Sequence, residues 1–299
     1  MMTSRSAPLL ATLPVCYDEK MVAEVTSYSP SAGKPKAAVA SWQQLGVPLE
    51  IQAPVPVHRD ALCLAHEAAY VDGVLSGSLR NGFGTRSPDV AASLAWTSGA
   101  MLSAARQAIA NGRVAVAPCS GFHHAGYASG GGFCTFNGLM VTALALLQEG
   151  SVARIGILDC DQHNGDGTDE IIDQLRLRGS ITHYTAGKYW GRASEASTFL
   201  GKLPDIVKSF GNCDVLLYQA GADPHMDDPL GGWLTTAQLA QRDRTVFAVA
   251  ERIGVPVVWN LAGGYQTPLR RVLDIHDNTL LACAQIHLAD WANRDLIAA

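Results

Sequence analysis

The chain of 299 residues lacks the features that mark several classes of protein, and each absence narrows its function. Its strictly apolar runs are short: ALALL in the 140s is far below the about 20 residues of a membrane-spanning helix. It has no block of basic residues, and its 22 Lys and Arg stand against 27 Asp and Glu, a net charge of −5. We therefore expect neither a membrane nor a nucleic acid as its partner.

A disulfide pattern is absent as well. The seven cysteines form no C-x-x-C pair and are odd in number, which favours reduced thiols in a cytoplasmic setting over a disulfide framework. The first 16 residues, MMTSRSAPLLATLPVC, contain one arginine and two prolines, a poor match to a secretory signal peptide. No internal repeat or low-complexity linker is visible, so we expect residues 1–299 to form a single domain.

Patterns of helix and strand alternate from about residue 87 onward. Ser87 stands where an N-cap is expected, Pro88 suits the first helical position, and Gly112 closes the helix. Continuous apolar strands separated by helices predict an α/β fold with a parallel sheet covered on both faces. The first 60 residues contain many helix and strand breakers, and we expect loops with one short strand there. Further helices are predicted at 136–150, 166–179 and 235–254, and strands at 113–118, 152–160, 180–185, 213–221 and 255–264.

Four of these strands run directly into polar, glycine-containing segments. Ligands bind at the carboxyl ends of the strands in open sheets of this kind, so the four segments are expected to meet at one site. The segments are GFHHAG, CDQHNGDG, GADPHMDD and AGGYQTP.

The segment after the second of these strands has the pattern of a metal site. Asp159, Asp161 and His163 follow i, i+2, i+4 spacing, which places their side chains on one side of an extended chain. Two carboxylates and an imidazole at the end of a buried strand would repel or lose solvation without a cation. Oxygen and nitrogen ligands suit zinc, and Asp223 can supply a further carboxylate. Spacing alone leaves open whether Asp159 is a ligand, and a turn cap with a loop histidine is the alternative.

Two other segments contain groups suited to catalysis. The adjacent pair His123-His124, in a glycine-flanked loop, suits proton transfer near neutral pH. Tyr265 follows two glycines, but by itself this pattern equally fits a tyrosine packed at a turn. The glycine-rich SGGGFCTFNG lacks both the G-x-G-x-x-G spacing and a Walker lysine, so a phosphate cradle is not expected.

These motifs together resemble the zinc-dependent histone deacetylase superfamily, which includes bacterial acetylpolyamine amidohydrolases and acetoin-utilisation proteins. The resemblance spans roughly residues 60–270, in the family's order, and its most specific parts are D-x-D-x-H-x-G-D-G, H-H-A and G-G-Y. It implies one deacetylase-like catalytic domain with an arginase-like three-layer αβα sandwich around an eight-stranded, mostly parallel sheet. It also implies a zinc-dependent deacylase that hydrolyses the amide of acyl-lysine or an acylpolyamine. The sequence leaves the oligomeric state open between a monomer and a homo-oligomer.

The resemblance also assigns roles by position. The implied zinc ligands are Asp161, His163 and Asp223; the implied catalytic residues are His123 with Asp159 behind it, His124 with Asp166 behind it, and Tyr265. The implied substrate-binding residues are Phe122, Gly132 and Phe133, with Tyr189 or Trp190 as the opposite wall. A potassium ion is suggested near the backbone of Asp159, Asp161 and His163.

The chain departs from the family pattern in two places that concern the substrate. The usual H-P-E/P-x-R segment is missing, with GKPKAAVASW at best its remnant, and the loop SLRNGFGTRSPD offers no acid at the rim unless Asp89 serves. The negative net charge slightly favours cationic products such as polyamines. Two other functions are weighed: an arginase-like ureohydrolase with two manganese ions, which has no use for the histidine pair or Tyr265, and a catalytically silent acyl-group binder.

Overall fold

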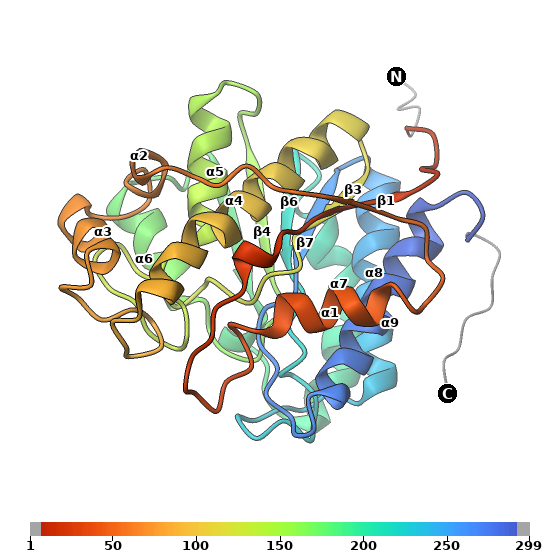
Figure 1. Cartoon of the computed structure of the whole chain (residues 1–299). Coiled ribbons are helices and arrows are strands. Elements are labelled where there is room, and N and C mark those ends of the chain that lie inside the picture. Colours follow the sequence, from red (N-terminus) through yellow and green to blue (C-terminus); the bar gives the residue numbers. More distant parts are fainter. Residues whose placement is uncertain (1–6, 292–299) are drawn as a thin grey trace.

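The computed structural model describes residues 7–291, and one parallel sheet forms its centre (Figure 1). The strand order is β2-β1-β3-β7-β6-β4-β5, and every pair of neighbours is parallel. All carboxyl ends therefore lie along one edge of the sheet. The strands are β1 (Leu13–Cys16), β2 (Leu49–Gln52), β3 (Val114–Val116), β4 (Ile155–Asp159), β5 (Ile181–Thr185), β6 (Val215–Gln219) and β7 (Val257–Asn260).

Helices cover both faces of the sheet, which gives three layers (Figure 1). One hydrophobic core joins the sheet to α1, α7, α8 and α9, and a second core joins the other face to α3, α4, α5 and α6. The α-helices are α1 (Lys34–Trp42), α2 (Arg59–Leu62), α3 (Ala68–Leu75), α4 (Pro88–Asn111), α5 (Gly138–Gln148), α6 (Asp166–Gln174), α7 (Ala196–Lys208), α8 (Thr236–Ile253) and α9 (Arg270–His287). The 3₁₀ helices are η1 (Glu19–Met21), η2 (Ala186–Lys188) and η3 (Ala193–Glu195).

The predicted signals for helix α4 are confirmed. The Ser87 hydroxyl accepts a hydrogen bond from the backbone N–H of Val90 at 3.3 Å, and Pro88 occupies the first turn. Gly112 ends the helix in the left-handed conformation with φ of 68°. The apolar strands alternate between the two cores: in β6, Leu216 and Tyr218 face one core while Leu217 faces the other.

The N-terminal region contains more regular structure than predicted. Instead of one strand, it contributes β1 and β2 to the sheet and helix α1 to one face. Both strands have only four residues, the buried β1 contains a proline, and the edge strand β2 is mostly exposed, so neither has a clear strand pattern.

The sheet has seven strands within the described residues, not the eight that the family resemblance implied. It ends at β5, and the chain then forms η2 and η3 rather than another edge strand. Gly187 of η2 lies so close to the backbone of His163 that a Cβ atom would come within 2.3 Å of its carbonyl carbon. This segment therefore packs back against the loop after β4 instead of extending the sheet.

Two further observations concern membranes and thiols. Across residues 7–291, no helix combines the length and apolarity needed to cross a bilayer. All seven cysteines lie in this range and are free thiols, as the sequence predicts.

Candidate active site

The carboxyl ends of four strands bring the candidate residues to one edge of the sheet. The loops after β3 and β4 carry His123-His124 and Asp161-x-His163, and the loops after β6 and β7 carry Asp223 and Tyr265. The register pairs Asp159 with Gln219 and Gln219 with Asn260, so β4, β6 and β7 end level with one another. The predicted convergence of these segments is thus observed.

Asp161, His163 and Asp223 form a three-residue cluster whose ligand atoms lie within 4.8 Å of one another. Nδ1 of His163 is 3.3 Å from Oδ1 of Asp161 and 3.2 Å from Oδ2 of Asp223. Oδ2 of Asp223 is buried yet accepts no hydrogen bond. The backbone around the cluster is tight, because a Cβ atom at Gly263 would lie 2.2 Å from this same oxygen.

The electrostatics of this cluster fit a bound cation. Burial and the neighbouring Asp161 carboxylate raise the pKa of Asp223 to about 7. The adjacent carboxylates of Asp161 and Asp223 raise the pKa of His163 to about 10. Both pKa values are raised because negative charge is concentrated in this buried cluster, and a divalent ion would neutralise that charge. Two carboxylate oxygens and one imidazole nitrogen, with room for a fourth ligand, are a donor set suited to catalytic zinc.

Asp159 faces away from this cluster and towards His123. Its Oδ2 accepts a hydrogen bond from Nδ1 of His123 at 2.7 Å and another from Thr185 at 3.2 Å. Its Oδ1 accepts from the side chain of Gln219 at 2.9 Å and the backbone N–H of Asp161 at 3.1 Å. Spacing left open whether Asp159 is a metal ligand; these four hydrogen bonds assign its carboxylate to orienting the histidine.

The two adjacent histidines have different electrostatic environments. Burial alone would lower the pKa of His123, but the carboxylates of Asp159 and Asp161 outweigh it and raise that pKa to about 9. Nδ1 of His124 lies 2.8 Å from Oδ1 of Asp166. Burial and the charge of His123 lower the pKa of His124. The pair thus places a charged imidazole beside a neutral one, with ring centroids 4.1 Å apart.

Tyr265 is held by residues that the sequence analysis did not single out. Its backbone N–H donates to Oδ2 of Asp228 at 2.8 Å. The fully buried Lys34, at the start of α1, donates from Nζ to the carbonyl of Ala262 at 2.5 Å. The glycine-rich loop that carries Tyr265 is therefore anchored from two sides. The only sequence signal for Lys34 was its place in GKPKAAVASW, where the family motif is altered.

Arg242 of α8 links the two segments that carry the candidate metal ligands, and sequence reasoning missed it too. Its guanidinium is fully buried, and Nη1 donates to the carbonyls of Cys160 at 3.1 Å and Gly221 at 2.7 Å. Nε donates to Asp243 at 2.8 Å. A buried ion pair does not by itself stabilise a fold, because removing both charges from water offsets their attraction. Positioning the loops after β4 and β6 is the more direct consequence of these contacts.

Replacing Arg242 with methionine is expected to weaken zinc binding by about 10–100-fold, the range found for residues that support metal ligands from behind. Arg113→Met is the matched control: Arg113 is equally buried and donates to the backbone carbonyls of Ala7 and Pro8, far along the chain from the ligands. Both variants should lower Tm, but only Arg242→Met should lose zinc affinity in a chelator competition. Equal zinc affinities for the two would show that Arg242 is merely structural.

The opening above the cluster is a depression of about 400 Å³. Gly132 and Phe133 line it, as the resemblance implied, and a Cβ atom at Gly132 would lie 2.5 Å from the ring of His124. Phe122 is buried and lines a smaller cavity beside it, together with Phe133. The opening is lined by Tyr28, Gly82, Phe83, Gly84, His124, Gly132, Phe133, His163, Leu230 and Tyr265.

Tyr189 and Trp190, expected as the opposite wall, do not line this opening. The ring of Tyr189 stacks on Tyr184 at 5.6 Å, and the Trp190 indole donates to the Tyr184 hydroxyl at 2.7 Å. Trp190 also packs against Phe199 of α7. These contacts hold both side chains against the β5–α7 segment. Asp89, the one acid proposed for the rim, lines a different groove at the start of α4.

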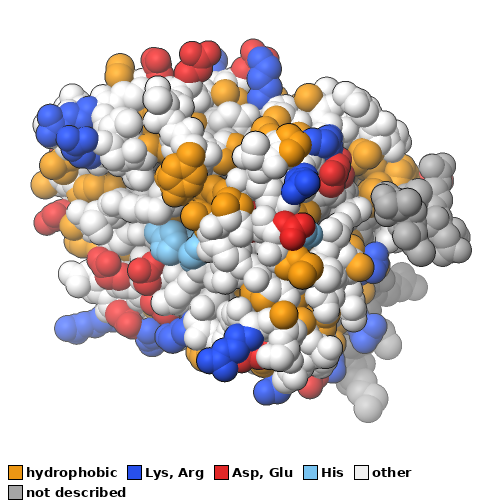
Figure 2. All heavy atoms as spheres, turned by 90° about the horizontal axis from the view of Figure 1, so that it is seen from below, with side chains coloured by type: hydrophobic (Ala, Val, Ile, Leu, Met, Phe, Trp, Pro, Cys, Tyr) orange, Lys and Arg blue, Asp and Glu red, His pale blue; other side chains and the backbone are white. Residues whose placement is uncertain are grey.

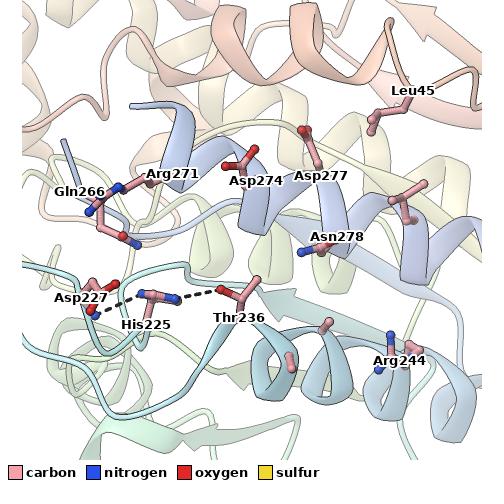
Figure 3. Close-up of a pocket in the computed structure, with 13 residues that line it drawn as sticks. Leu45, His225, Asp227, Thr236, Arg244, Gln266, Arg271, Asp274, Asp277 and Asn278 are labelled. Carbon is pink, nitrogen blue, oxygen red and sulfur yellow. Dashed lines mark hydrogen bonds between the residues drawn. The ribbon is translucent and has the colours of Figure 1, made fainter. Parts of the chain in front are cut away.

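A larger groove of about 950 Å³ lies between α8 and α9 (Figure 3). It passes His225, two residues beyond Asp223, and Gln266, which follows Tyr265. None of the predicted ligands or catalytic residues lines it. The depression that contains His124, His163 and Tyr265 is therefore the candidate active site, although it is the smaller of the two.

Comparisons with known proteins identify relatives in sequence. The chain is 29% identical over 241 residues to an uncharacterized protein of Picosynechococcus sp., covering 73% of this chain and 79% of that protein. It is 30% identical over 175 residues to the acetylpolyamine amidohydrolase of Mycoplana ramosa, 49% of this chain and 50% of that protein. Histone deacetylase 2 of Arabidopsis thaliana is 26% identical over 172 residues, 51% of this chain and 44% of that one. The chain thus spans about half or less of these two named relatives.

Solved structures share the fold. The HDA15 HD domain superposes with a TM-score of 0.74 at 20% identity, over 92% of this chain and 88% of that one. An acetylpolyamine aminohydrolase from Burkholderia pseudomallei gives 0.72 at 17% identity, over 92% and 99%. The family model for the histone deacetylase domain matches residues 31–176 and 176–280. As its motifs predicted, the chain belongs to the histone deacetylase family.

Proposed function

We propose that this chain is a zinc-dependent deacylase that hydrolyses the amide of an acylated amine, acyl-lysine or an acylpolyamine, to a free amine and a carboxylate. The observation that carries the proposal is the cluster of Asp161, His163 and Asp223, whose ligand atoms lie within 4.8 Å of one another beside two histidine–carboxylate pairs. Family membership supports deacylase chemistry in general; zinc and the substrate are our inference. A potassium ion near Asp159, Asp161 and His163 stays a prediction.

Zinc held by the three side chains would supply Lewis-acid polarisation of the acyl carbonyl and of a water molecule. Tyr265 lines the same opening as His124 and His163 and would donate its hydroxyl hydrogen to the oxygen of the carbonyl as negative charge develops there. Burial and the nearby Asp161 and Asp223 carboxylates raise the pKa of Tyr265 far above its usual value, so the hydroxyl keeps its proton at any working pH.

His124 is suited to move the proton. Because its Nδ1–H donates to Asp166, the lone pair is at Nε2, which can take a proton from the attacking water. The same nitrogen can then pass that proton to the leaving amine as the C–N bond breaks. His123, held charged by Asp159 and Asp161, stabilises the negative charge of the transition state without exchanging a proton.

The test is hydrolysis of a panel of acyl-lysine peptides and acylpolyamines by the full chain, before and after removal of metal with a chelator. We expect turnover of at least one acylated amine, its loss in the chelated protein, and its return with one equivalent of zinc. Inhibition by a hydroxamate, which binds zinc, serves as a positive control. A protein that binds zinc but turns over none of the panel would instead support the silent acyl-group binder. Activity that requires two manganese ions per chain would support the ureohydrolase.

A further inference from the structure

We propose that the natural substrate is an acylated amine whose body, beyond the acylated arm, is uncharged and aromatic or apolar, and that acetylated polyamines are poor substrates. This inference rests on the deacylase function proposed above and concerns the residues at the entrance to that site. The net charge of −5 instead favours cationic polyamines. The charges near the entrance, however, act on a substrate more strongly than the net charge of the whole chain.

Aromatic side chains form one side of the entrance. Phe133 is the centre of this group: its ring centroid lies 5.3 Å from that of Tyr28, 5.8 Å from Phe83 and 5.7 Å from Tyr265. Tyr28 is 71% exposed, and Leu230 adds a further exposed apolar side chain. Figure 2 shows hydrophobic side chains gathered beside the histidine side chains on this face. A substrate whose body extends from the opening on this side contacts this surface.

The residues that line the entrance also include no acid. No acidic residue of the described range 7–291 lines it. Asp166 lies behind His124: its side chain is 67% exposed, and Oδ1 accepts hydrogen bonds from Nδ1 of His124 and the N–H of Gly167. In the loop that contributes Leu230, Asp228 is buried against backbone N–H groups, and Asp227 lines the groove between α8 and α9 instead (Figure 3).

The loop between α3 and α4 adds positive charge at the same side. Residues 76–87 include Arg80 and Arg86, both exposed, and no Asp or Glu. The side chain of Arg80 folds onto the carbonyl of Gly84, which lines the opening. A polyamine carries its remaining ammonium groups close to the acylated end, so it would bring these charges to a lining that has no carboxylate and that adjoins the Arg80 guanidinium.

The aromatic surface can attract either a cationic group of the substrate or an apolar one. An ammonium group over a ring gains a cation–π contact, which is weak when the site stays in water. A ring or branched aliphatic group of the substrate gains binding free energy in proportion to the apolar area it removes from water. Such a group can cover Tyr28, Phe83 and Leu230 at the same time. With like charge on the adjacent loop, the second attraction is the stronger, and it selects a neutral, apolar body.

The test compares two probes that carry the same acetyl group: a capped peptide in which acetyl-lysine is flanked by tryptophan and leucine, and N8-acetylspermidine. Using the zinc-loaded full chain, we expect kcat/KM for the peptide to be at least about tenfold higher, as expected when one ring is buried. A higher kcat/KM for acetylspermidine would overturn the inference and leave the deacylase proposal standing. Failure of both probes and of the whole panel would overturn the deacylase proposal, and this inference with it.

Variants of the entrance make the test specific. Tyr28→Ser should lower the ratio of the two kcat/KM values by about fivefold through a higher KM for the peptide, and Tyr28→Phe should restore it, because the ring supplies the apolar area. Leu230→Glu should raise kcat/KM for acetylspermidine. Ile51→Glu is the matched control: Ile51 is 38% exposed, against 36% for Leu230, and lies on the edge strand β2 outside the opening. If Ile51→Glu raises acetylspermidine turnover as much as Leu230→Glu, net charge rather than the entrance selects the substrate and the inference fails.

Discussion

Replacing Tyr265 with phenylalanine is expected to lower kcat by about two to three orders of magnitude, the usual effect of removing one oxyanion donor. The variant keeps the ring that packs 5.7 Å from Phe133 and the backbone N–H that donates to Asp228, and loses only the hydroxyl. KM should change little, because the hydrogen bond forms chiefly as charge develops on the carbonyl oxygen. Steady-state kinetics on one acylated amine, with zinc content measured in the same preparation, check both points.

Tyr184→Phe is the control for loss of a tyrosine hydroxyl. The Tyr184 hydroxyl accepts a hydrogen bond from Trp190 at 2.7 Å and does not line the opening, so kcat should stay at the wild-type value. Wild-type turnover by Tyr265→Phe would refute the role assigned to this hydroxyl. A fall in activity together with loss of zinc would show that Tyr265 supports the site structurally instead.

Replacing Asp223 with asparagine is expected to abolish zinc binding at micromolar concentrations and with it all deacylase activity. The change removes one of the two proposed carboxylate ligands while preserving side-chain volume in a site where the Gly263 backbone lies close to Oδ2. Replacing a residue that only supports a metal ligand lowers zinc affinity by about 10–100-fold. Replacing a ligand itself should lower zinc affinity by more than that. Zinc should raise Tm of the wild type, since a ligand that binds only the folded state stabilises it, and should leave Tm of the variant unchanged.

Asp227→Asn provides the comparison for the loss of one negative charge nearby. Asp227 lies four residues further along the same loop but is exposed and lines the groove between α8 and α9. Its variant should bind zinc and turn over substrate as the wild type does. Undiminished zinc affinity in Asp223→Asn would remove Asp223 from the ligand set and leave the loop after β6 without a role in metal binding.

The part of the site that could be predicted from sequence is the part that rests on strand ends. Asp161, His163 and Asp223 follow buried apolar strands directly, so the parallel sheet alone brings them together. Spacing could not separate Asp159 from the ligands, because alternation places its side chain on the same side as theirs. Hydrogen bonds from His123 and Gln219 turn the Asp159 carboxylate away from the cluster. Because these two residues belong to other segments of the chain, the spacing of residues around Asp159 cannot reveal them.

The residues that sequence reasoning missed or misplaced reach the site through tertiary contacts. Lys34 and Arg242 are charged side chains that the fold buries completely. From a helix pattern alone, charged residues are expected to be exposed to solvent. Tyr189 and Trp190 lie near the site in sequence, but their contacts with Tyr184 hold them on the β5–α7 segment. One short strand was expected where the structure has two, β1 and β2, because four residues are too few to show a period.

The most direct test of the metal centre is a crystal structure of the zinc-loaded chain with anomalous diffraction data collected at the zinc absorption edge. We predict one anomalous peak per chain, about 2.0–2.2 Å from a carboxylate oxygen of Asp161, from Nδ1 of His163 and from a carboxylate oxygen of Asp223. No peak between these three side chains, or two peaks bridged by carboxylates, would contradict the single zinc centre.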